Sequence, residues 1–140
     1  MTHLQQHSLS FATRGRGFQE ITTDIARLVA ASGIRSGLCQ LFLRHTSASI
    51  CITENAAPEV RADLERWISG VVPDGDPRYA HVDEGPDDMP AHVRNLLGGC
   101  QLTVPLHEGR LGLGTWQGIY LWEHRRQGHR RELLVTLWGE

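Results

Sequence analysis

Apolar residues recur along the chain with two different periods, and the changes of period divide the chain into helices and strands. A spacing of three to four residues predicts an amphipathic helix over residues 18–32, ended by Gly33. The same spacing predicts a second helix from an Asn55 cap to Gly70 and a third from Asp87 or Asp88 to Gly98. Alternating or continuous apolar runs predict strands over residues 3–13, 37–53 with a break near Thr46, 101–107, 111–124 and 133–138.

The helical spacing also predicts which side chains face the interior. In the second helix the predicted apolar stripe contains Val60, Leu64, Trp67 and Ile68. In the third helix the predicted inward face contains Met89, His92, Val93 and Leu96. The order of elements, with helices early and antiparallel strands late, predicts the α+β class. We expect one compact domain over residues 1–140, a largely antiparallel β-sheet with about three helices packed on it.

Composition narrows the class of protein. The 140 residues carry a formal net charge of −2, which argues against a dedicated nucleic-acid binder. The chain has no apolar run long enough for a membrane span and no signal-peptide pattern, so we expect a soluble cytoplasmic protein with no membrane partner. The three cysteines are odd in number and far apart in the sequence, which predicts buried free thiols: Cys39, Cys51 and Cys100.

Residues 81–92 hold the densest group of chemically active side chains in the chain. Two histidines and four carboxylates fall within these twelve residues, at the predicted start of the third helix. Asp88 and His92 are four apart and share one helix face, and His81 and Glu84 precede them in a loop. Imidazole and carboxylate together suit a divalent metal or acid–base chemistry. The alternative is a helix cap with solvated acids and an incidental histidine.

Three further polar residues lie beside apolar rows. His45 ends the row formed by Cys39, Leu41 and Leu43, and Glu123 ends the row formed by Gln117, Ile119 and Leu121. A histidine at a strand end is a candidate ligand or catalytic group, although a hydrogen-bonded core histidine is the alternative. Asp63 flanks the stripe of the second helix, where it either meets an interior cation or an arginine, or stays free on the surface.

Three separated motifs in this order resemble the YjbQ family. The first runs from His45 to Ser49 and continues through Glu54, Asn55 and the helix with Asp63. The second is the stretch of residues 81–92 described above. The third is Leu113-Gly114-Thr115-Trp116-Gln117-Gly118-Ile119, followed by Glu123. The resemblance covers nearly the whole chain.

This resemblance implies an α+β fold that assembles as a homotrimer, with sites near the subunit boundaries. It also implies a weak thiamine-phosphate-synthase-like activity, in which a pyrimidine pyrophosphate is joined to a thiazole phosphate. Carried onto this sequence, the resemblance implies a site made of His45, Asn55, Asp63, His81, Glu84, Asp88, His92 and Glu123, with Thr115, Trp116 and Gln117 lining it for substrate.

Three functions remain open for such a site. A synthase would need magnesium held by carboxylates, and arginines such as those of residues 125–131 could meet the phosphates. The histidines favour zinc over magnesium, which predicts a zinc-dependent hydrolase with metal ligands His45, His81 and His92 and a base chosen among Glu84, Asp88 and Glu123. The third function is a non-enzymatic binding protein for a small phosphorylated or anionic metabolite.

Overall fold

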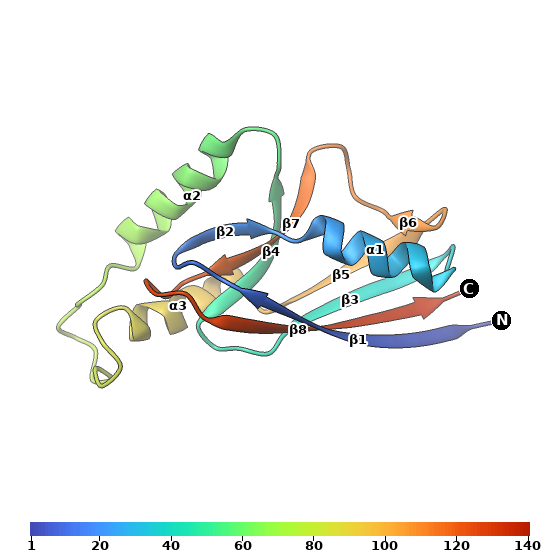
Figure 1. Cartoon of the computed structure of the whole chain (residues 1–140). Coiled ribbons are helices and arrows are strands. Elements are labelled where there is room, and N and C mark those ends of the chain that lie inside the picture. The colour runs from blue at the N-terminus through green and yellow to red at the C-terminus, as the bar shows by residue number, and fades with distance from the viewer.

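The strands of the chain form two antiparallel sheets that share one core (Figure 1). The structure is a computed structural model and describes residues 1–140. In chain order the elements are β1 (His3–Ala12), β2 (Gly17–Glu20), α1 (Thr22–Ser32), β3 (Gly37–Leu43), β4 (Ala48–Glu54), α2 (Pro58–Val71), α3 (Asp88–Gly98), β5 (Gln101–His107), β6 (Arg110–Leu111), β7 (Gln117–Glu123) and β8 (Arg130–Gly139). The predicted α+β class, with three helices and antiparallel strands in one compact domain, is confirmed.

The larger sheet has five strands in the order β1-β8-β3-β5-β6, and the smaller has three in the order β2-β7-β4. Every neighbouring pair is antiparallel. Both chain ends lie at the same end of the larger sheet, where His3 pairs with Gly139. The sequence pattern predicted one sheet, and the second arises because β7 turns away from β6 to pair with β2 and β4.

The two sheets and α1 enclose one cluster of 16 buried residues. The cluster draws on alternate positions of the strands, as expected for sheets that are buried on one face. Its members include Ile25 and Val29 of α1, Leu41 and Leu43 of β3, Ile50 of β4, Ile119 and Leu121 of β7, and Val135 and Leu137 of β8. This core fixes the small sheet against the large one, and thus fixes where the ends of β4 and β7 lie.

The other two helices lie outside this core. Helix α3 packs along the start of β4, whereas α2 projects away from the sheets (Figure 1). The two helices are joined through Arg94, which is only 1% exposed and contacts the Glu65 carboxylate at 3.3 Å and the Val72 carbonyl at 3.2 Å. A guanidinium buried this deeply needs such partners, because an unpaired buried charge is strongly unfavourable.

The pairing of β4 with β7 separates two regions that the sequence motifs had suggested as one site. Ala48 pairs with Glu123 at one end of the ladder, and Glu54 pairs with Gln117 at the other. At about 3.3 Å per residue, the six intervening steps place these ends roughly 20 Å apart. Helix α3 binds the first end, because the Asn95 amide donates to the Ala48 carbonyl at 2.7 Å.

The predicted helix over residues 18–32 begins later than expected. Residues 17–20 form β2 instead, and Phe18 stacks on Trp122 of β7 with ring centroids 4.3 Å apart. The helix begins at Thr22, whose hydroxyl accepts the amide N–H of Ile119 at 2.8 Å and makes no N-cap bond. The aromatic contact and the pairing with β7 outweigh the helical spacing of this stretch. Gly33 ends the helix in the left-handed conformation, as predicted.

Two predicted inward side chains face solvent. Trp67 is 60% exposed because α2 packs through Ile68, and neighbouring helix residues point about 100° apart. Leu96 is 83% exposed because the buried face of α3 contains Asp88, Ala91 and Arg94, two of which are charged. Helix α2 also runs through Gly70 to Val71. None of the three helices combines the length and the apolar character needed to cross a membrane.

The three cysteines are free thiols. Cys39 is buried in the core, whereas Cys51 and Cys100 are half-buried, so the predicted burial holds fully only for Cys39. Burial raises the pKa of both the Cys39 and the Cys51 thiol to about 12. Neither is therefore available as a thiolate nucleophile near neutral pH.

Candidate functional site

A carboxylate at the start of α3 lies between two histidines. Asp88 is 1% exposed, and its Oδ2 atom lies 2.9 Å from His81 Nε2 and 3.1 Å from His92 Nε2. His92 comes from one turn further along α3, and His81 comes from the loop before the helix. Residue 87 is the N-cap and Pro90 occupies the first turn, which fixes where the helix begins and thus where Asp88 points.

The orientation of the His92 ring is set by the turn between β3 and β4. Its Nδ1 atom lies 2.7 Å from the Thr46 carbonyl oxygen, and a carbonyl can only accept, so Nδ1 carries a proton. Nε2 of the same ring therefore faces Asp88. This arrangement, in which one ring nitrogen donates to a backbone carbonyl and the other is free to coordinate, is common among metal-binding histidines.

The second oxygen of Asp88 is occupied by an arginine. Arg125, in the loop after β7, places one terminal nitrogen 2.9 Å from Asp88 Oδ1 and its Nε atom 2.9 Å from Asp87 Oδ2. Burial by itself would raise the pKa of Asp88, but the hydrogen bond with His81 and the charges of His92 and Arg125 outweigh it and lower that pKa. Asp88 is thus held ionised and directed.

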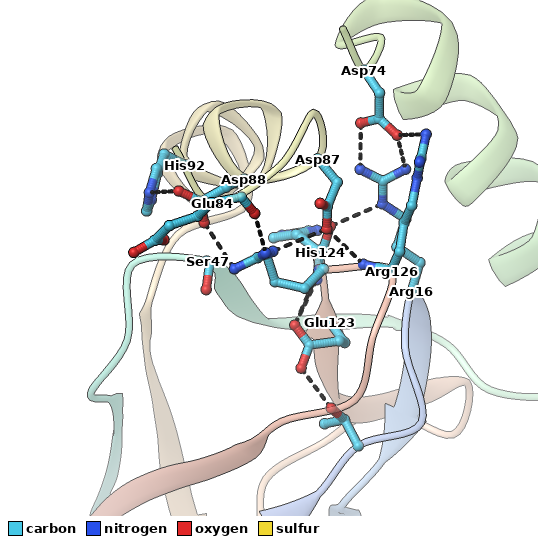
Figure 2. Close-up of polar contacts among 12 residues, drawn as sticks. Arg16, Ser47, Asp74, Glu84, Asp87, Asp88, His92, Glu123, His124 and Arg126 are labelled. Carbon is cyan, nitrogen blue, oxygen red and sulfur yellow. Dashed lines mark hydrogen bonds and ion pairs between the residues drawn. The ribbon is translucent and has the colours of Figure 1, made fainter. Parts of the chain in front are cut away.

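Asp87 has a different role although it is the neighbouring residue. Its Oδ2 atom accepts from Arg125 Nε and from the backbone N–H of Arg126, both at 2.9 Å. Burial opposes ionisation, but these bonds lower the pKa of Asp87 to about 2. Figure 2 shows Asp87 turned toward the loop after β7, whereas Asp88 and Glu84 lie toward His92. Asp87 fastens the helix start to that loop.

Glu84 is the remaining carboxylate beside this group. It is exposed, lies next to Asp88 in Figure 2, and no arginine, lysine or histidine forms an ion pair with it. Its backbone carbonyl accepts from Arg125 at 3.0 Å, which holds the residue in place, and its carboxylate lies against that of Asp88 without an ion pair of its own. A free carboxylate next to a cation site can take up a proton from bound water.

The two histidines and Asp88 could together hold a metal ion. Each of His81, Asp88 and His92 offers one ligand atom, and the three atoms lie within 4.8 Å of one another. Zinc bonds of about 2.0–2.2 Å in a tetrahedral site keep ligand atoms roughly 3.4 Å apart. The Asp88 oxygen lies 2.9 and 3.1 Å from the two histidine nitrogens, so both histidines would move slightly away from it, and both would turn toward the ion. The side chains of His81 and His92 are 47% and 30% exposed, which leaves the remaining positions open to water or substrate.

The structure does not bring His45, the third predicted metal ligand, into this group. Its Nε2 atom accepts the backbone N–H of Glu132 at 2.7 Å, on the far side of the turn that carries Thr46. Burial, followed by the charge of Arg131, lowers the pKa of His45. His45 therefore joins β3 to β8, and it is its neighbour Thr46 that contacts the site.

Glu123, a predicted base, is fully engaged in the interior. It is 1% exposed, pairs with Arg131 through both oxygens, and accepts the Thr13 hydroxyl at 2.5 Å. Its Oε2 atom also accepts the backbone N–H groups of His124 and Arg125 at 3.1 and 3.2 Å. Burial opposes ionisation, but the bonds from Arg131 and Thr13 outweigh it and lower the pKa of Glu123. This carboxylate shapes the loop after β7.

The other predicted site residues lie elsewhere in the chain. Asp63 is on the exposed face of α2, where it pairs with Arg66 at 2.6 Å. The backbone N–H of Asn55 donates to the Trp116 carbonyl at 3.0 Å. Residue 55 and the segment 115–117 therefore form one group at the far end of the β4–β7 ladder. Trp116 is 65% exposed there. Within one chain the ladder, roughly 20 Å long, separates this group from the end where α3 packs.

Sequence reasoning missed Arg125 and the Thr46 carbonyl as parts of the site. The arginines of residues 125–131 had been predicted to meet phosphates. Arg125 instead forms ion pairs with Asp87 and Asp88, and Arg131 forms one with Glu123. The sequence contains a signal, because an excess of carboxylates in residues 83–88 requires nearby cations. It does not say which of the 14 arginines supplies them.

Solved structures of similar shape share this fold over nearly their whole length. A YjbQ/UPF0047-family protein of Clostridium acetobutylicum superposes with a TM-score of 0.82 at 34% identity, covering 95% of this chain and 98% of that one. A YbjQ-like protein of unknown function from Sulfolobus solfataricus superposes with a TM-score of 0.85 at 24% identity, covering 99% and 100%. The second supports the fold alone.

Sequence comparison gives the same family. The profile described as "UPF0047 protein YjbQ-like" matches residues 7–140. A UPF0047 protein of Synechocystis sp. is 47% identical over 135 residues, covering 96% of this chain and 92% of that protein. The UPF0047 protein YjbQ of Salmonella typhimurium is 45% identical over 136 residues, covering 96% and 98%. The chain therefore belongs to the YjbQ (UPF0047) family.

Proposed function

We propose that the chain binds zinc through His81, Asp88 and His92 and uses it to hydrolyse a small anionic substrate. The observation that supports this proposal is the placement of the His92 ring between two acceptors. Nδ1 donates to the Thr46 carbonyl, so the Nε2 atom of a neutral ring directs its lone pair at an oxygen of Asp88 only 3.1 Å away. Two lone pairs at this distance repel unless a cation, either a second proton or a metal ion, lies between them.

The surroundings favour a metal ion over a proton. His81 Nε2 meets the same Asp88 oxygen at 2.9 Å, so two imidazoles and one carboxylate converge on one small space. Imidazole nitrogen with a single carboxylate oxygen is a typical donor set for zinc, whereas magnesium prefers oxygen alone. Three protein ligands with an open side are the pattern of catalytic rather than structural zinc sites.

The chain's own residues then divide the chemical work. Zinc, when bound, lowers the pKa of a coordinated water and polarises the bond to be cleaved. Glu84, exposed and without an ion pair, takes the proton from the attacking water and returns it to the leaving group. The Thr46 carbonyl holds the His92 ring in the tautomer that leaves Nε2 free.

Metal analysis of three proteins tests the ligand set. The wild type should purify with, or take up, about one zinc ion per chain, and His92→Ala should lose it. His45→Ala is the matched control, because His45 contacts Glu132 and not the proposed ligands, so this variant should keep its zinc. Zinc retained in His92→Ala, or lost only in His45→Ala, would contradict the ligand set.

Turnover separates the hydrolase from a binding protein. The zinc-loaded wild type and Glu84→Gln would be incubated with a panel of phosphate esters, phosphoanhydrides and lactones. We expect Glu84→Gln to bind zinc normally while its turnover falls by about 100-fold or more, which is the usual range for losing a general base. A substrate that is retained unchanged over long incubation by both proteins would indicate a non-enzymatic binding protein instead.

We propose the thiamine-phosphate-synthase-like reaction, implied by the family resemblance, as a side activity of the same site. Glu84 and Asp88 offer the oxygen ligands that magnesium needs to assist departure of pyrophosphate. The nearest arginines are engaged: Arg125 with Asp88, and Arg16 with Asp74 at 2.6 Å. We therefore expect slow synthesis with magnesium, abolished by Asp88→Asn. Synthesis that survives this substitution would place the reaction elsewhere.

We propose a homotrimer in which a neighbouring subunit completes the site. The predicted substrate-binding residues 115–117 and the predicted catalytic residue Asn55 lie at the far end of the β4–β7 ladder. The ladder, roughly 20 Å long, separates them from the end where α3 packs, too far to share a small ligand with the histidines of the same chain. Co-expression of Asp88→Asn with Trp116→Ala tests this directly. Each variant alone should be inactive. Mixed trimers should regain activity, because at some subunit interfaces the intact Asp88 of one subunit meets the intact Trp116 of its neighbour. Failure to regain activity, or a monomer in sedimentation, would contradict the assembly.

A further inference from the structure

Arg125 makes three contacts around the start of α3, and each goes to a different acceptor. One terminal nitrogen binds Asp88 Oδ1 at 2.9 Å, Nε binds Asp87 Oδ2 at 2.9 Å, and the other terminal nitrogen binds the Glu84 carbonyl at 3.0 Å. The side chain is 17% exposed, so these bonds form largely away from water. No other side chain contacts all three of these residues.

These contacts divide the Asp88 carboxylate into two halves. Oδ1 faces Arg125, whereas Oδ2 faces His81 and His92. The Asp88 side chain is only 2% exposed, so an Oδ1 atom without Arg125 would lie buried with an unpaired charge. The carboxylate would then be free to rotate and present either oxygen to the histidines. Arg125 prevents that rotation.

The position of Arg125 is itself determined from the interior. Its backbone N–H donates to Glu123 Oε2 at 3.2 Å, and that carboxylate is held by Arg131. The neighbouring Arg126 backbone N–H donates to Asp87. The buried acid at the end of β7 therefore fixes the loop that presents Arg125, which gives Glu123 an indirect role in the site.

We infer that Arg125 is a positioning residue that directs one oxygen of Asp88 at His81 and His92. The inference rests on the proposed function for its link to zinc, but the orientation of Asp88 exists with or without a metal. It depends on the flat, three-way donor geometry of a guanidinium. A lysine keeps the positive charge but offers a compact ammonium that cannot reach three acceptors in these directions. Charge alone therefore does not replace Arg125.

Arg125→Lys tests this geometry, and Arg126→Lys is the matched control. Arg126 is the next residue in the same loop, and its side chain is 57% exposed and pairs with Asp74, not with the site. Both variants keep the net charge and the hydrogen bonds that the backbone N–H groups of residues 125 and 126 donate to Glu123 and Asp87. Circular dichroism and thermal unfolding would verify that both are folded before any comparison.

The first measurement uses the metal-free proteins. The imidazole carbon–proton resonances of His81 and His92, assigned with His81→Gln and His92→Gln, report what lies next to each ring at a fixed pH. Both resonances should shift in Arg125→Lys and stay in place in Arg126→Lys. Resonances unchanged in Arg125→Lys would overturn the inference, whatever the metal result.

The second measurement adds zinc and cobalt. Zinc affinity, measured by competition with a chromophoric chelator, should fall about 10- to 100-fold in Arg125→Lys, the usual cost of losing an outer partner of a metal ligand. The visible spectrum of bound Co²⁺ should change in the same variant, because the ligand geometry changes. Unchanged affinity and spectrum would overturn the role. A wild type without metal affinity would refute the proposed zinc function alone, and the resonances would still decide the orientation of Asp88.

Discussion

Lowering the pH is expected to destabilise the folded protein through one buried histidine, His124. This residue is 0% exposed, and its Nε2 atom lies 2.8 Å from the Ser49 hydroxyl. Nδ1 is buried without any hydrogen-bond partner, and the ring lies 4.9 Å from that of Trp122. Burial, followed by the charges of Arg94 and Arg16, lowers the pKa of His124 from 6.5 to about 3. The folded protein therefore keeps this ring neutral.

The size of the effect follows from the two pKa values. In the unfolded chain His124 has its ordinary pKa of 6.5, so the unfolded form takes up this proton as the pH falls below that value. The folded form does not take it up until about pH 3. Between these values each pH unit lowers the free energy of unfolding by about 1.4 kcal/mol. From about pH 7.5 to about pH 4.5 the loss from this residue is about 2.7 kcal/mol.

Urea denaturation of the wild type and of His124→Gln at both pH values measures this loss. Glutamine can still hydrogen-bond to Ser49 but does not titrate, and the remaining histidines and carboxylates are common to both proteins. Between the two pH values, the free energy of unfolding should fall by about 2 to 3 kcal/mol more in the wild type than in His124→Gln. Protein concentration must be equal throughout, since any assembly shifts the apparent stability. Equal losses in the two proteins would refute the assignment of a neutral, buried His124.

Two further substitutions have matched controls in the same chain. A Cβ atom at Gly98 would lie 2.6 Å from Ser49 Oγ, so Gly98→Ala should lower the free energy of unfolding by about 1–3 kcal/mol. A Cβ atom at Gly70 would have no atom within 4 Å, so Gly70→Ala should instead raise the free energy of unfolding by about 0.5–1 kcal/mol. If urea denaturation shows both substitutions changing stability in the same direction, the packing argument at Gly98 is contradicted. Arg131→Met leaves Glu123 buried without its cation and should cost about 3–5 kcal/mol. Arg44→Met removes an exposed 4.0 Å pair with Glu132 and should stay within about 0.5 kcal/mol; a similar cost for both would contradict the burial argument.

Most of the fold could be predicted from residue spacing, because the strands obey their periodicity. The predicted break near Thr46 separates β3 from β4, and the strand predicted over residues 101–107 is β5. The strand at residues 17–20 could not be predicted, because its pairing with β7 spans about a hundred residues and depends on the stacking of Phe18 on Trp122. A helical period in the local sequence cannot reveal such a partner.

The site could be located from the sequence but not assembled from it. The density of histidines and acids indicated the start of α3, and the structure brings His81, Asp88 and His92 together there. The backbone carbonyl that orients His92 has no sequence signature, since any residue at position 46 would supply it. The exposure of Leu96 has a related cause, because the buried face of α3 includes two charged residues whose partners lie in other elements.

Three carboxylates within five residues show how partners distant in sequence decide chemistry. Asp87 meets the loop after β7 and fastens the helix. Asp88 meets an arginine on one oxygen and two histidines on the other. Glu84 binds Arg125 through its backbone carbonyl, and its carboxylate forms no ion pair. The first is therefore structural, the second suits a directed ligand, and the third suits a base. Their shared distinguishing contact is Arg125, about forty residues later in the chain. Asp88 thus differs from its neighbours because it divides its two oxygens between an arginine and two imidazoles. This arrangement exists only once β7 has brought Arg125 to α3.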